Sequence, residues 1–308
     1  MILCVCPSPA LDVTYHVGEL VAGATVRVGS VAERPGGKAV NVARVLHALG
    51  EPVLLVAPAG GETGDRMHAG LDAAGVPSRL VPDRAATRRT VTVVEAGGRA
   101  TCLTEPATSS CWPELVAAVE ESLADARVVV VAGRLPEGIP ARGLTALVTA
   151  ARAAGVPVIA DTHGAALVEA LEAGCLVVKP NAEELAQVTD DQDPTRAARR
   201  LCDRYGVAVV VSRGHQGVVA ATRSGTWEAR PAAALSGNPT GAGDALVAGL
   251  AGALAHDHAA LDHPEQTLRD AVALSVAAVR SPTAGELDLS GHAETRAAVA
   301  VRALDGVG

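Results

Sequence analysis

The chain alternates short apolar runs with amphipathic segments, and this alternation predicts the fold class. From Val128 onward, apolar runs typical of buried parallel strands are separated by stretches with helical spacing. Strands that alternate with helices indicate parallel βαβ units with right-handed crossovers. We therefore predict an α/β protein of three layers, with a mainly parallel sheet between helices. The predicted strands are 128–132, 156–160, 176–178 and 207–211, and the predicted helices are 143–154, 165–173 and 195–205.

The N-terminal third shows a second pattern beside this one. Residues 1–6 form an apolar run, residues 39–49 have helical spacing that ends at Gly50, and 53–57 returns as an apolar strand. Between them, 13–17 and 25–32 alternate apolar and polar residues, as strands covered on one face do. A further pair of strands, 90–94 and 100–103, is joined by Ala-Gly-Gly and predicts a hairpin.

Composition limits the class of protein. A hydrophobic fraction of 49% over 308 residues provides ample core, built from Val, Leu and Ala because the chain has no Phe. The net charge of −8 argues against nucleic acid or a membrane surface as a partner. The six cysteines form no CxxC pair, and no run reaches the roughly 18 apolar residues of a membrane span. With no basic leader before the first apolar run, these features predict a cytoplasmic protein with free thiols.

A glycine-rich loop near the C-terminus is the strongest candidate for a site. Residues 238–244 read Asn-Pro-Thr-Gly-Ala-Gly-Asp and lead directly into an apolar helix. Gly241, Ala242 and Gly243 are small, so free N–H groups and the positive end of the helix dipole could receive a phosphate there. Asp244, in the first helical turn, is placed to accept a proton from an attacking hydroxyl. By itself, this loop fits a simple turn with Asp244 as a helix cap equally well.

A second glycine pair opens a helix more than two hundred residues earlier, in Arg-Pro-Gly-Gly-Lys-Ala-Val-Asn-Val-Ala-Arg at 34–44. Two such loops suggest two bound groups. Together they resemble the two signatures of the PfkB group of ribokinase-like carbohydrate kinases, and most closely the branch containing 1-phosphofructokinase and tagatose-6-phosphate kinase. The further matches are Ala10-Leu11-Asp12, Thr87-Arg88, Gly133-Arg134-Leu135-Pro136, Lys179 to Glu184, Ser212-Arg213-Gly214 with Gly217, and Pro282 to Gly285.

The resemblance implies a single ribokinase-like kinase domain over 1–308 with a small β-sheet lid, whose strands are inserted at about 13–33 and 88–104. It implies ATP-dependent phosphorylation of fructose 1-phosphate, tagatose 6-phosphate or fructose 6-phosphate to a 1,6-bisphosphate, with Mg²⁺ as cofactor. Asp244 is then the general base, and the amides at Gly241, Ala242 and Gly243 stabilise the transferred phosphoryl group. Because two short lid pieces have too few strands to be stable alone, we also expect a homodimer formed through the lid.

The resemblance also assigns the sugar site. Asp12, the backbone of Gly36 and Gly37, and Asn41 are expected to hold hydroxyl groups, although a glycine turn followed by a helix-start Asn would give the same pattern. A phosphate that is not transferred needs cations. The candidates are Lys38, Arg88 and Arg134. Arg134 departs from the family, which usually has Ser at this position, so it either replaces that hydroxyl as a phosphate ligand or marks a different substrate.

On the nucleotide side, the resemblance places ATP against two segments, the turn at 212–217 and the loop at 281–285. Glu184 is expected to position Mg²⁺, largely through water. The spacing Asn-x-x-Glu at 181–184 is also what a capping box would produce, so this alternative stays open. The residues expected to contact the nucleotide are Lys179, Asn181, Ser212, Gly214, Gly217, Thr240, Gly243 and Ala284.

Two other functions remain compatible with the sequence. One is a kinase of an unphosphorylated sugar or a nucleoside on the same fold, and the other is a non-catalytic protein that senses a sugar or nucleotide. An intact Asp244 argues against a sensor, which needs no base. A dinucleotide-binding oxidoreductase is excluded because no GxGxxG follows the first strand.

Overall fold

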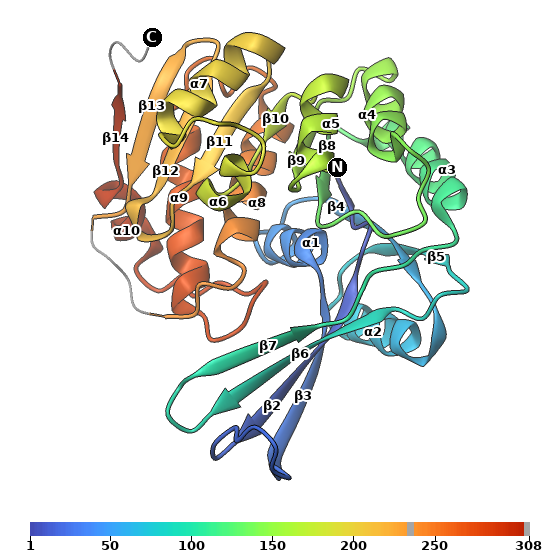
Figure 1. Ribbon diagram of the computed structural model, residues 1–308. Helices are drawn as coiled ribbons and strands as arrows, with labels where there is room; N and C mark the ends of the chain where they lie inside the picture. The colour runs from blue at the N-terminus through green and yellow to red at the C-terminus, as the bar shows by residue number, and fades with distance from the viewer. Residues whose placement is uncertain (233–236, 305–308) are drawn as a thin grey trace.

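The computed structural model describes residues 1–232 and 237–304, and its largest feature is a sheet of ten described strands. These strands are β1 (Ile2–Val5), β4 (Val53–Ala59), β5 (Ser78–Pro82), β8 (Val128–Ala132), β9 (Val158–Asp161), β10 (Val177–Val178), β11 (Ala208–Ser212), β12 (Val218–Thr222), β13 (Gly225–Arg230) and β14 (Ala300–Ala303). Their order is β14-β13-β12-β11-β10-β9-β8-β1-β4-β5. In this sheet order, the seven strands β11-β10-β9-β8-β1-β4-β5 are parallel. Strands β12 to β14 extend one edge in antiparallel fashion (Figure 1).

Helices cover both faces of this sheet, as the sequence predicts. One face carries α1 (Lys38–Ala48), α2 (Gly61–Ala73), α8 (Ala242–His256) and α9 (Pro264–Arg280). The other carries α3 (Trp112–Ser122), α4 (Gly143–Ala153), α5 (Ala165–Ala173), α6 (Ala182–Ala186) and α7 (Pro194–Tyr205). The remaining pieces are α10 (His292–Ala298), which packs on α9, and the 3₁₀ turns η1 (Leu123–Asp125) and η2 (Gly214–Gln216).

Strand β1 shows how the sequence forms two cores. Its side chains alternate between faces, so Ile2 and Cys4 join the core beneath α1 and α8, while Leu3 and Val5 join the core beneath α3 and α4. All four are buried. A strand with helices on both sides must therefore be apolar at every position, which is why β1 reads as a continuous apolar run.

A second sheet of four strands, here called the lid, projects away from the layered domain (Figure 1). Its strands are β2 (Ala10–Val17), β3 (Val28–Gly36), β6 (Arg88–Glu95) and β7 (Ala100–Thr104), in the order β3-β2-β6-β7. Strands β2 and β6 are parallel, and the two outer pairs are antiparallel. The lid strands connect directly to the main domain, because β2 follows the exit loop of β1 and β3 leads into α1.

The predicted elements are present, but several bounds differ. Strand β3 begins at Val28 rather than Thr25 and continues through Pro35 to Gly36. A proline fits there because β3 lies at the edge of the lid, where one side of the strand needs no backbone donor. The sequence pattern did not predict helices α2, α3 and α10, nor strands β5 and β12 to β14. Except in β12, which is a short apolar run, the mixed polarity of these stretches gives a weaker signal than the continuous runs of the central strands.

No helix in residues 1–232 or 237–304 is both long enough and apolar enough to cross a membrane.

Candidate active site

The carboxyl ends of the parallel strands meet at one edge of the sheet, where polar side chains converge. Asp161 ends β9, and Lys179 directly follows β10. Lys38 opens α1, and Asp244 lies in the first turn of α8. Open α/β sheets bind ligands outside these strand ends, so the topology itself indicates a site here.

Asp161 lies at the centre of this cluster, and the sequence analysis did not single it out. Its Oδ1 atom accepts a 2.9 Å hydrogen bond from Lys38 Nζ, and its Oδ2 atom lies 3.4 Å from Lys179 Nζ. The side chain is fully buried, and Oδ2 has no hydrogen-bond donor among the described residues. A polar residue immediately after a predicted apolar parallel strand was the signal that could have identified it.

Asp244 is buried, and a residue from the other glycine loop holds it. Asn41 Nδ2 donates a 2.8 Å hydrogen bond to Asp244 Oδ2. The pKa of Asp244 is raised to about 6, mainly by burial and also by the negative charge of Asp161, against the opposing effects of Asn41, Lys38 and Lys179. The carboxylate is therefore largely ionised near pH 7 and can still accept a proton, as a general base requires.

Lys38, which directly follows Gly36 and Gly37, contacts two carboxylates. Its Nζ atom also lies 3.4 Å from Glu184 Oε1. Burial lowers the pKa of Lys38, but the charges of Asp161 and Glu184 outweigh that effect and raise it. Lys38 is therefore a permanent cation, held by carboxylates inside the cluster.

The start of α8, where an anion site is predicted, has free backbone N–H groups, although not all of the expected ones. Gly241 has φ of 87°, a left-handed conformation, and no side chain caps the helix. Within the described part of the chain, the N–H groups of Gly243 and Asp244 have no acceptor, so they are free for an anion. The N–H of Ala242 donates to the carbonyl of Pro239 at 3.3 Å, so it is not a free donor as we expected. A Cβ on Gly243 would lie 3.5 Å from Lys179 Nζ, which places a cation beside these amides.

Glu184 and Asn181 form the capping box that the sequence analysis kept as an alternative. Asn181 Oδ1 accepts from the N–H of Glu184 at 2.8 Å, and Glu184 Oε2 accepts from the N–H of Asn181 at 2.8 Å. Asn181 also pairs with Ser212 through an isolated parallel bridge. Since both oxygens of Glu184 have partners in the protein, it could meet a metal ion only by way of water or by exchanging partners.

The residues of the cluster fit Mg²⁺ bound mainly by phosphate and water. No group of three or more His, Cys, Asp or Glu side chains able to enclose a metal occurs among the residues that the structure describes. The cluster nevertheless has three carboxylates against two lysines, and Asp161 Oδ2 lacks a hydrogen-bond donor. An excess of buried negative charge favours a further cation, and Mg²⁺ usually retains waters and substrate oxygens as ligands.

Asp12, which is expected to hold a sugar hydroxyl, lies against the glycine pair Gly36-Gly37. A Cβ on Gly36 would come within 2.1 Å of the Asp12 carboxylate, so only glycine leaves that carboxylate its space. Gly37 has φ of 108° and approaches Cys6 and Pro9 closely. Burial raises the pKa of Asp12, and a hydrogen bond from Thr90 and the charges of Arg88 and Arg44 oppose this shift.

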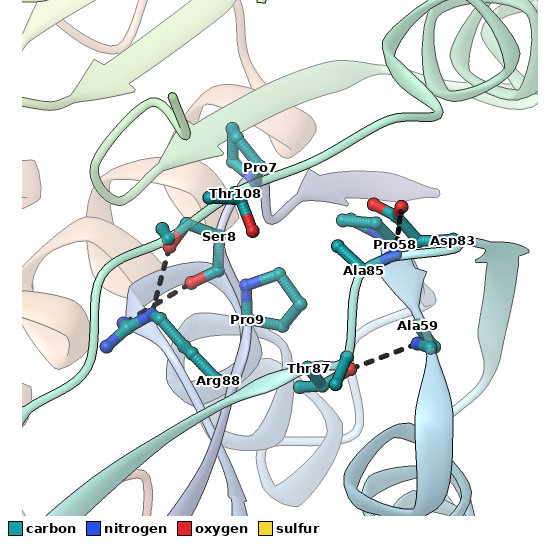
Figure 2. Close-up of a pocket in the computed structure, with 13 residues that line it drawn as sticks. Pro7, Ser8, Pro9, Pro58, Ala59, Asp83, Ala85, Thr87, Arg88 and Thr108 are labelled. Carbon is teal, nitrogen blue, oxygen red and sulfur yellow. Dashed lines mark hydrogen bonds between the residues drawn. The ribbon is translucent and has the colours of Figure 1, made fainter. Parts of the chain in front are cut away.

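Arg88 lies at the junction of the lid and the main domain, beside the exit loop of β1. Figure 2 shows its guanidinium reaching toward Ser8. Nε donates to the hydroxyl oxygen of Ser8 at 3.1 Å, and Nη2 donates to the carbonyl oxygen of Ser8 at 3.4 Å. Nη1 donates to Thr90 at 3.2 Å. The adjacent cavity of about 20 Å³ is the size of one water molecule, so it is not a sugar pocket. Arg89, the next residue along β6, is exposed.

The structure does not bring Arg134 into the cluster. Arg134 follows β8 at the same edge of the sheet and is exposed. No hydrogen bond or ion pair links its side chain to another described residue. It is therefore a cation without a charged partner among residues 1–232 and 237–304, at the edge of the sheet where β8 ends.

The expected nucleotide residues occupy four separate segments, at 179–181, 212–217, 240–243 and 284. Ser212 ends β11, Gly214 begins η2, and Gly217 follows η2 with φ of 79°, where a Cβ would lie 2.1 Å from the carbonyl oxygen of Ala229. Thr240 is exposed just before the anion site. Ala284 packs against Gly241, since a Cβ built on Gly241 would lie 3.1 Å from the Cα atom of Ala284. Thr240 and Ala284 therefore adjoin the start of α8.

Comparison with known proteins agrees with this architecture. Residues 4–289 match the pfkB family carbohydrate kinases. The chain is 35% identical over 259 residues to the ATP-dependent 6-phosphofructokinase isozyme 2 of Mycobacterium tuberculosis, covering 79% of this chain and 74% of that protein. It is 33% identical over 310 residues to the 1-phosphofructokinase of Xanthomonas campestris, covering 96% of each.

Solved structures show the same fold. The phosphofructokinase-2 of Escherichia coli in complex with potassium superposes with a TM-score of 0.87 at 27% identity, covering 96% of this chain and 98% of that one. A further structure of that enzyme, described as its tetrameric inhibited form, has a TM-score of 0.85 at 28% identity with the same coverage. The chain belongs to the pfkB family of carbohydrate kinases. The predicted ribokinase-like α/β/α fold with a small separate sheet is confirmed.

Proposed function

We propose that this protein is an ATP-dependent kinase that phosphorylates a hydroxyl of a phosphorylated ketohexose to give a 1,6-bisphosphate. The substrates that we propose are fructose 1-phosphate or tagatose 6-phosphate, and then fructose 6-phosphate. The names of the relatives support a phosphosugar, since they include both a 1-phosphofructokinase and a 6-phosphofructokinase. The observation that carries the proposal is Asp244, buried at a helix N-terminus, held by Asn41 and with a pKa near 6.

Asp244 accepts the proton of the attacking hydroxyl. Its Oδ2 atom is engaged by Asn41, and no other hydrogen bond to the carboxylate is recorded among the described residues, so Oδ1 is the proposed acceptor. Asn41 lies in the first turn of α1, directly after Gly36 and Gly37. One residue therefore links the base to the glycine pair that is proposed to bind the sugar. This arrangement favours alignment of the hydroxyl with the base, which is the main requirement of phosphoryl transfer.

The free amides of Gly243 and Asp244, with Lys179 beside them, are proposed to stabilise charge on the transferred phosphoryl group. Fixed donors of this kind cost no reorganisation during the reaction, and loss of one commonly costs on the order of a hundredfold. Mg²⁺, when bound, would supply positive charge that offsets the negative charge of the ATP phosphates. Asp161 and Glu184 are the side chains proposed to hold it, largely through water.

The phosphate that is not transferred is proposed to lie between the lid and the exit loops of β1 and β8. Arg88 is half-buried and oriented by Ser8 and Thr90, so its position is defined before substrate binds. Arg134 has no partner among the described residues and can turn toward an anion. Asp12 and the backbone of Gly36 and Gly37 are proposed to receive sugar hydroxyls.

ATP is proposed to lie along the carboxyl edge between the turn after β11 and the loop at 281–285. Lys179 and Asn181 are proposed for its phosphate end, together with Thr240 and Gly243. Aliphatic contact is proposed to hold the adenine, since the chain has few aromatic residues. The residues proposed to line this side are Ser212, Gly214, Gly217 and Ala284.

The experiment that tests this function is a coupled ADP-release assay over a panel of sugars and sugar phosphates. The expected result is ATP- and Mg²⁺-dependent turnover of at least one ketohexose phosphate, with kcat/KM at least a hundredfold above that of free fructose. Asp244→Asn is the matched control for contaminating kinases. If free hexoses or nucleosides are turned over as well as any sugar phosphate, the free-sugar alternative replaces the proposal. Binding without turnover of any of these compounds would favour a sensor.

We also propose that the protein acts in the cytoplasm as a homodimer formed through the lid. The six cysteines are free, as a reducing compartment favours. The outer lid strands β3 and β7 expose apolar side chains, including Val31 and Leu103 at 57% and 58%. Unpaired strand edges beside exposed apolar residues are surfaces that a second copy can cover.

A further inference from the structure

Glu286 joins the base of the lid to helix α1. Its Oε1 atom accepts hydrogen bonds from Arg34 Nη1 on lid strand β3 and from Arg44 Nη2 on α1, each at 3.0 Å. Arg44 Nη1 also donates to the carbonyl oxygen of Ala284 at 3.1 Å. The carboxylate of Glu286 therefore bridges two arginines that lie on either side of Gly36 and Gly37 in the sequence.

The loop that carries Glu286 is packed onto the residues around Asp244. Gly285 has φ of 74°, and a Cβ there would lie 2.8 Å from Asn41 Oδ1. A Cβ on Gly241 would lie 3.1 Å from the Cα atom of Ala284. Because these approaches leave no room for a side chain, the loop cannot shift without disturbing Asn41 or the start of α8.

We propose that Glu286 is a positioning residue that couples the sugar side of the site to the nucleotide side, by tying lid strand β3 to the loop at 281–286. The inference rests on the proposed function, which assigns the lid base to the sugar phosphate and this loop to ATP. With β3 and the loop joined, a ligand that orders one lowers the entropic cost of ordering the other. Glu286 contacts neither the base nor the anion site, so its role is indirect.

The strength of the coupling follows from the exposure of the partners. The side chains of Arg34 and Glu286 are 43% and 45% exposed, and an isolated pair of this kind contributes little. The side chain of Arg44 is only 13% exposed and has two acceptors, which makes the three-residue bridge more rigid than a simple pair. We expect binding of one substrate to tighten the other about three- to tenfold.

The test measures the Kd of a non-hydrolysable ATP analogue by calorimetry, with and without a saturating concentration of the best sugar phosphate from the panel. The ratio of the two values should be about three to ten in the wild type and close to one in Glu286→Gln and in Arg34→Ala. The double variant Arg34→Ala/Glu286→Gln should give the same ratio as either single variant, because each substitution breaks the same bridge. Arg34→Lys keeps the cation and should restore part of the coupling.

Glu33→Gln is the matched control. Glu33 precedes Arg34 on the same strand and pairs with Arg66 of α2 at 2.8 Å, away from the loop. This variant should keep the wild-type ratio. The inference is overturned if the wild-type ratio is one, if Glu286→Gln leaves the ratio unchanged, or if Glu33→Gln lowers it equally.

Hydrogen exchange of the unliganded protein separates this inference from the proposed function. In Glu286→Gln, amides of both β3 and 281–286 should exchange faster than in the wild type, whereas Glu33→Gln should leave 281–286 unchanged. Unchanged exchange in Glu286→Gln would overturn the tie whatever the substrate is. Faster exchange in a protein that turns over no sugar phosphate would retain the tie and reject the proposed function.

Discussion

Asn41 and Asp244 are 203 residues apart in sequence, and Asn41 Nδ2 donates a 2.8 Å hydrogen bond to Asp244 Oδ2. This bond joins the two glycine loops of the chain, because Asn41 lies in the helix that follows Gly36 and Gly37, and Asp244 lies in the helix that follows Gly241. A donor to the ionised carboxylate favours the charged form, which is the form that a general base needs.

The first prediction concerns pH. Because Asp244 must be ionised and its pKa is about 6, kcat/KM should fall as pH decreases through about 6. Asn41→Ala removes a bond that lowers this pKa, so the acid limb should move to higher pH. The measurement is a pH–rate profile from pH 5 to 9. The sugar phosphate titrates in the same range, but its own pKa is the same for the wild type and for Asn41→Ala. An identical midpoint of the acid limb in the two enzymes would therefore contradict the assignment of Asp244.

The second prediction concerns stability. The pKa of Asp244 is raised from 3.8 to about 6 in the folded protein, so its ionisation opposes folding above that range. Asp244→Asn should therefore stabilise the protein at pH 8, by up to about 3 kcal/mol, and this gain should disappear below about pH 4. Urea unfolding at several pH values measures it. A destabilised Asp244→Asn protein at pH 8 would mean that the ionised carboxylate supports the fold.

The third prediction concerns Arg88 and Arg134. Charge-assisted bonds to a phosphate contribute roughly 1.5 to 3 kcal/mol each, so Arg88→Ala and Arg134→Ala should each raise KM for the sugar phosphate about ten- to a hundredfold. KM for ATP should change little. Arg89→Ala is the control, since Arg89 is exposed beside Arg88. If only Arg88 matters, Arg134 is a surface residue; if neither does, the substrate carries no phosphate at this place.

The fourth prediction concerns assembly. Sedimentation velocity at micromolar concentration should give about twice the 30.9 kDa chain mass. Leu103→Glu places a charge on an exposed apolar residue of lid strand β7 and should favour the monomer. Leu49→Glu, at the exposed end of α1 and outside the lid, should leave the dimer intact. A wild-type protein of about 31 kDa would contradict a dimer.

Much of the fold could be predicted because its central strands have continuous apolar runs. The strand at 128–132 and the helix at 165–173 have the predicted bounds, since burial on both faces or an amphipathic period gives a clear signal there. The later strands β12 to β14 were missed. They form an antiparallel edge. Strands β13 and β14 have mixed polarity that resembles that of loops, whereas β12 is a short apolar run, Val-Val-Ala-Ala-Thr, that was overlooked.

The site was predicted less completely, for a physical reason. Asp244 and Asn41 lie in motifs with unusual local composition, which sequence can reveal. Asp161 and Glu286 lie in no such motif, and their importance comes from partners distant in sequence, such as Lys38 and Arg34. Such pairings depend on the tertiary fold. The engagement of the Ala242 amide by Pro239 likewise depends on local backbone geometry rather than on residue type.

The central claim is that Asp244 is the base of a phosphosugar kinase, and the most direct test is the steady-state kinetics of Asp244→Asn with the best sugar phosphate. The variant keeps the shape of the side chain and can still accept the bond from Asn41, so only the basic group is lost. The account predicts a fall in kcat of about 10² to 10⁴ with the Kd for nucleotide little changed. A variant that retains more than a tenth of the wild-type kcat would contradict it.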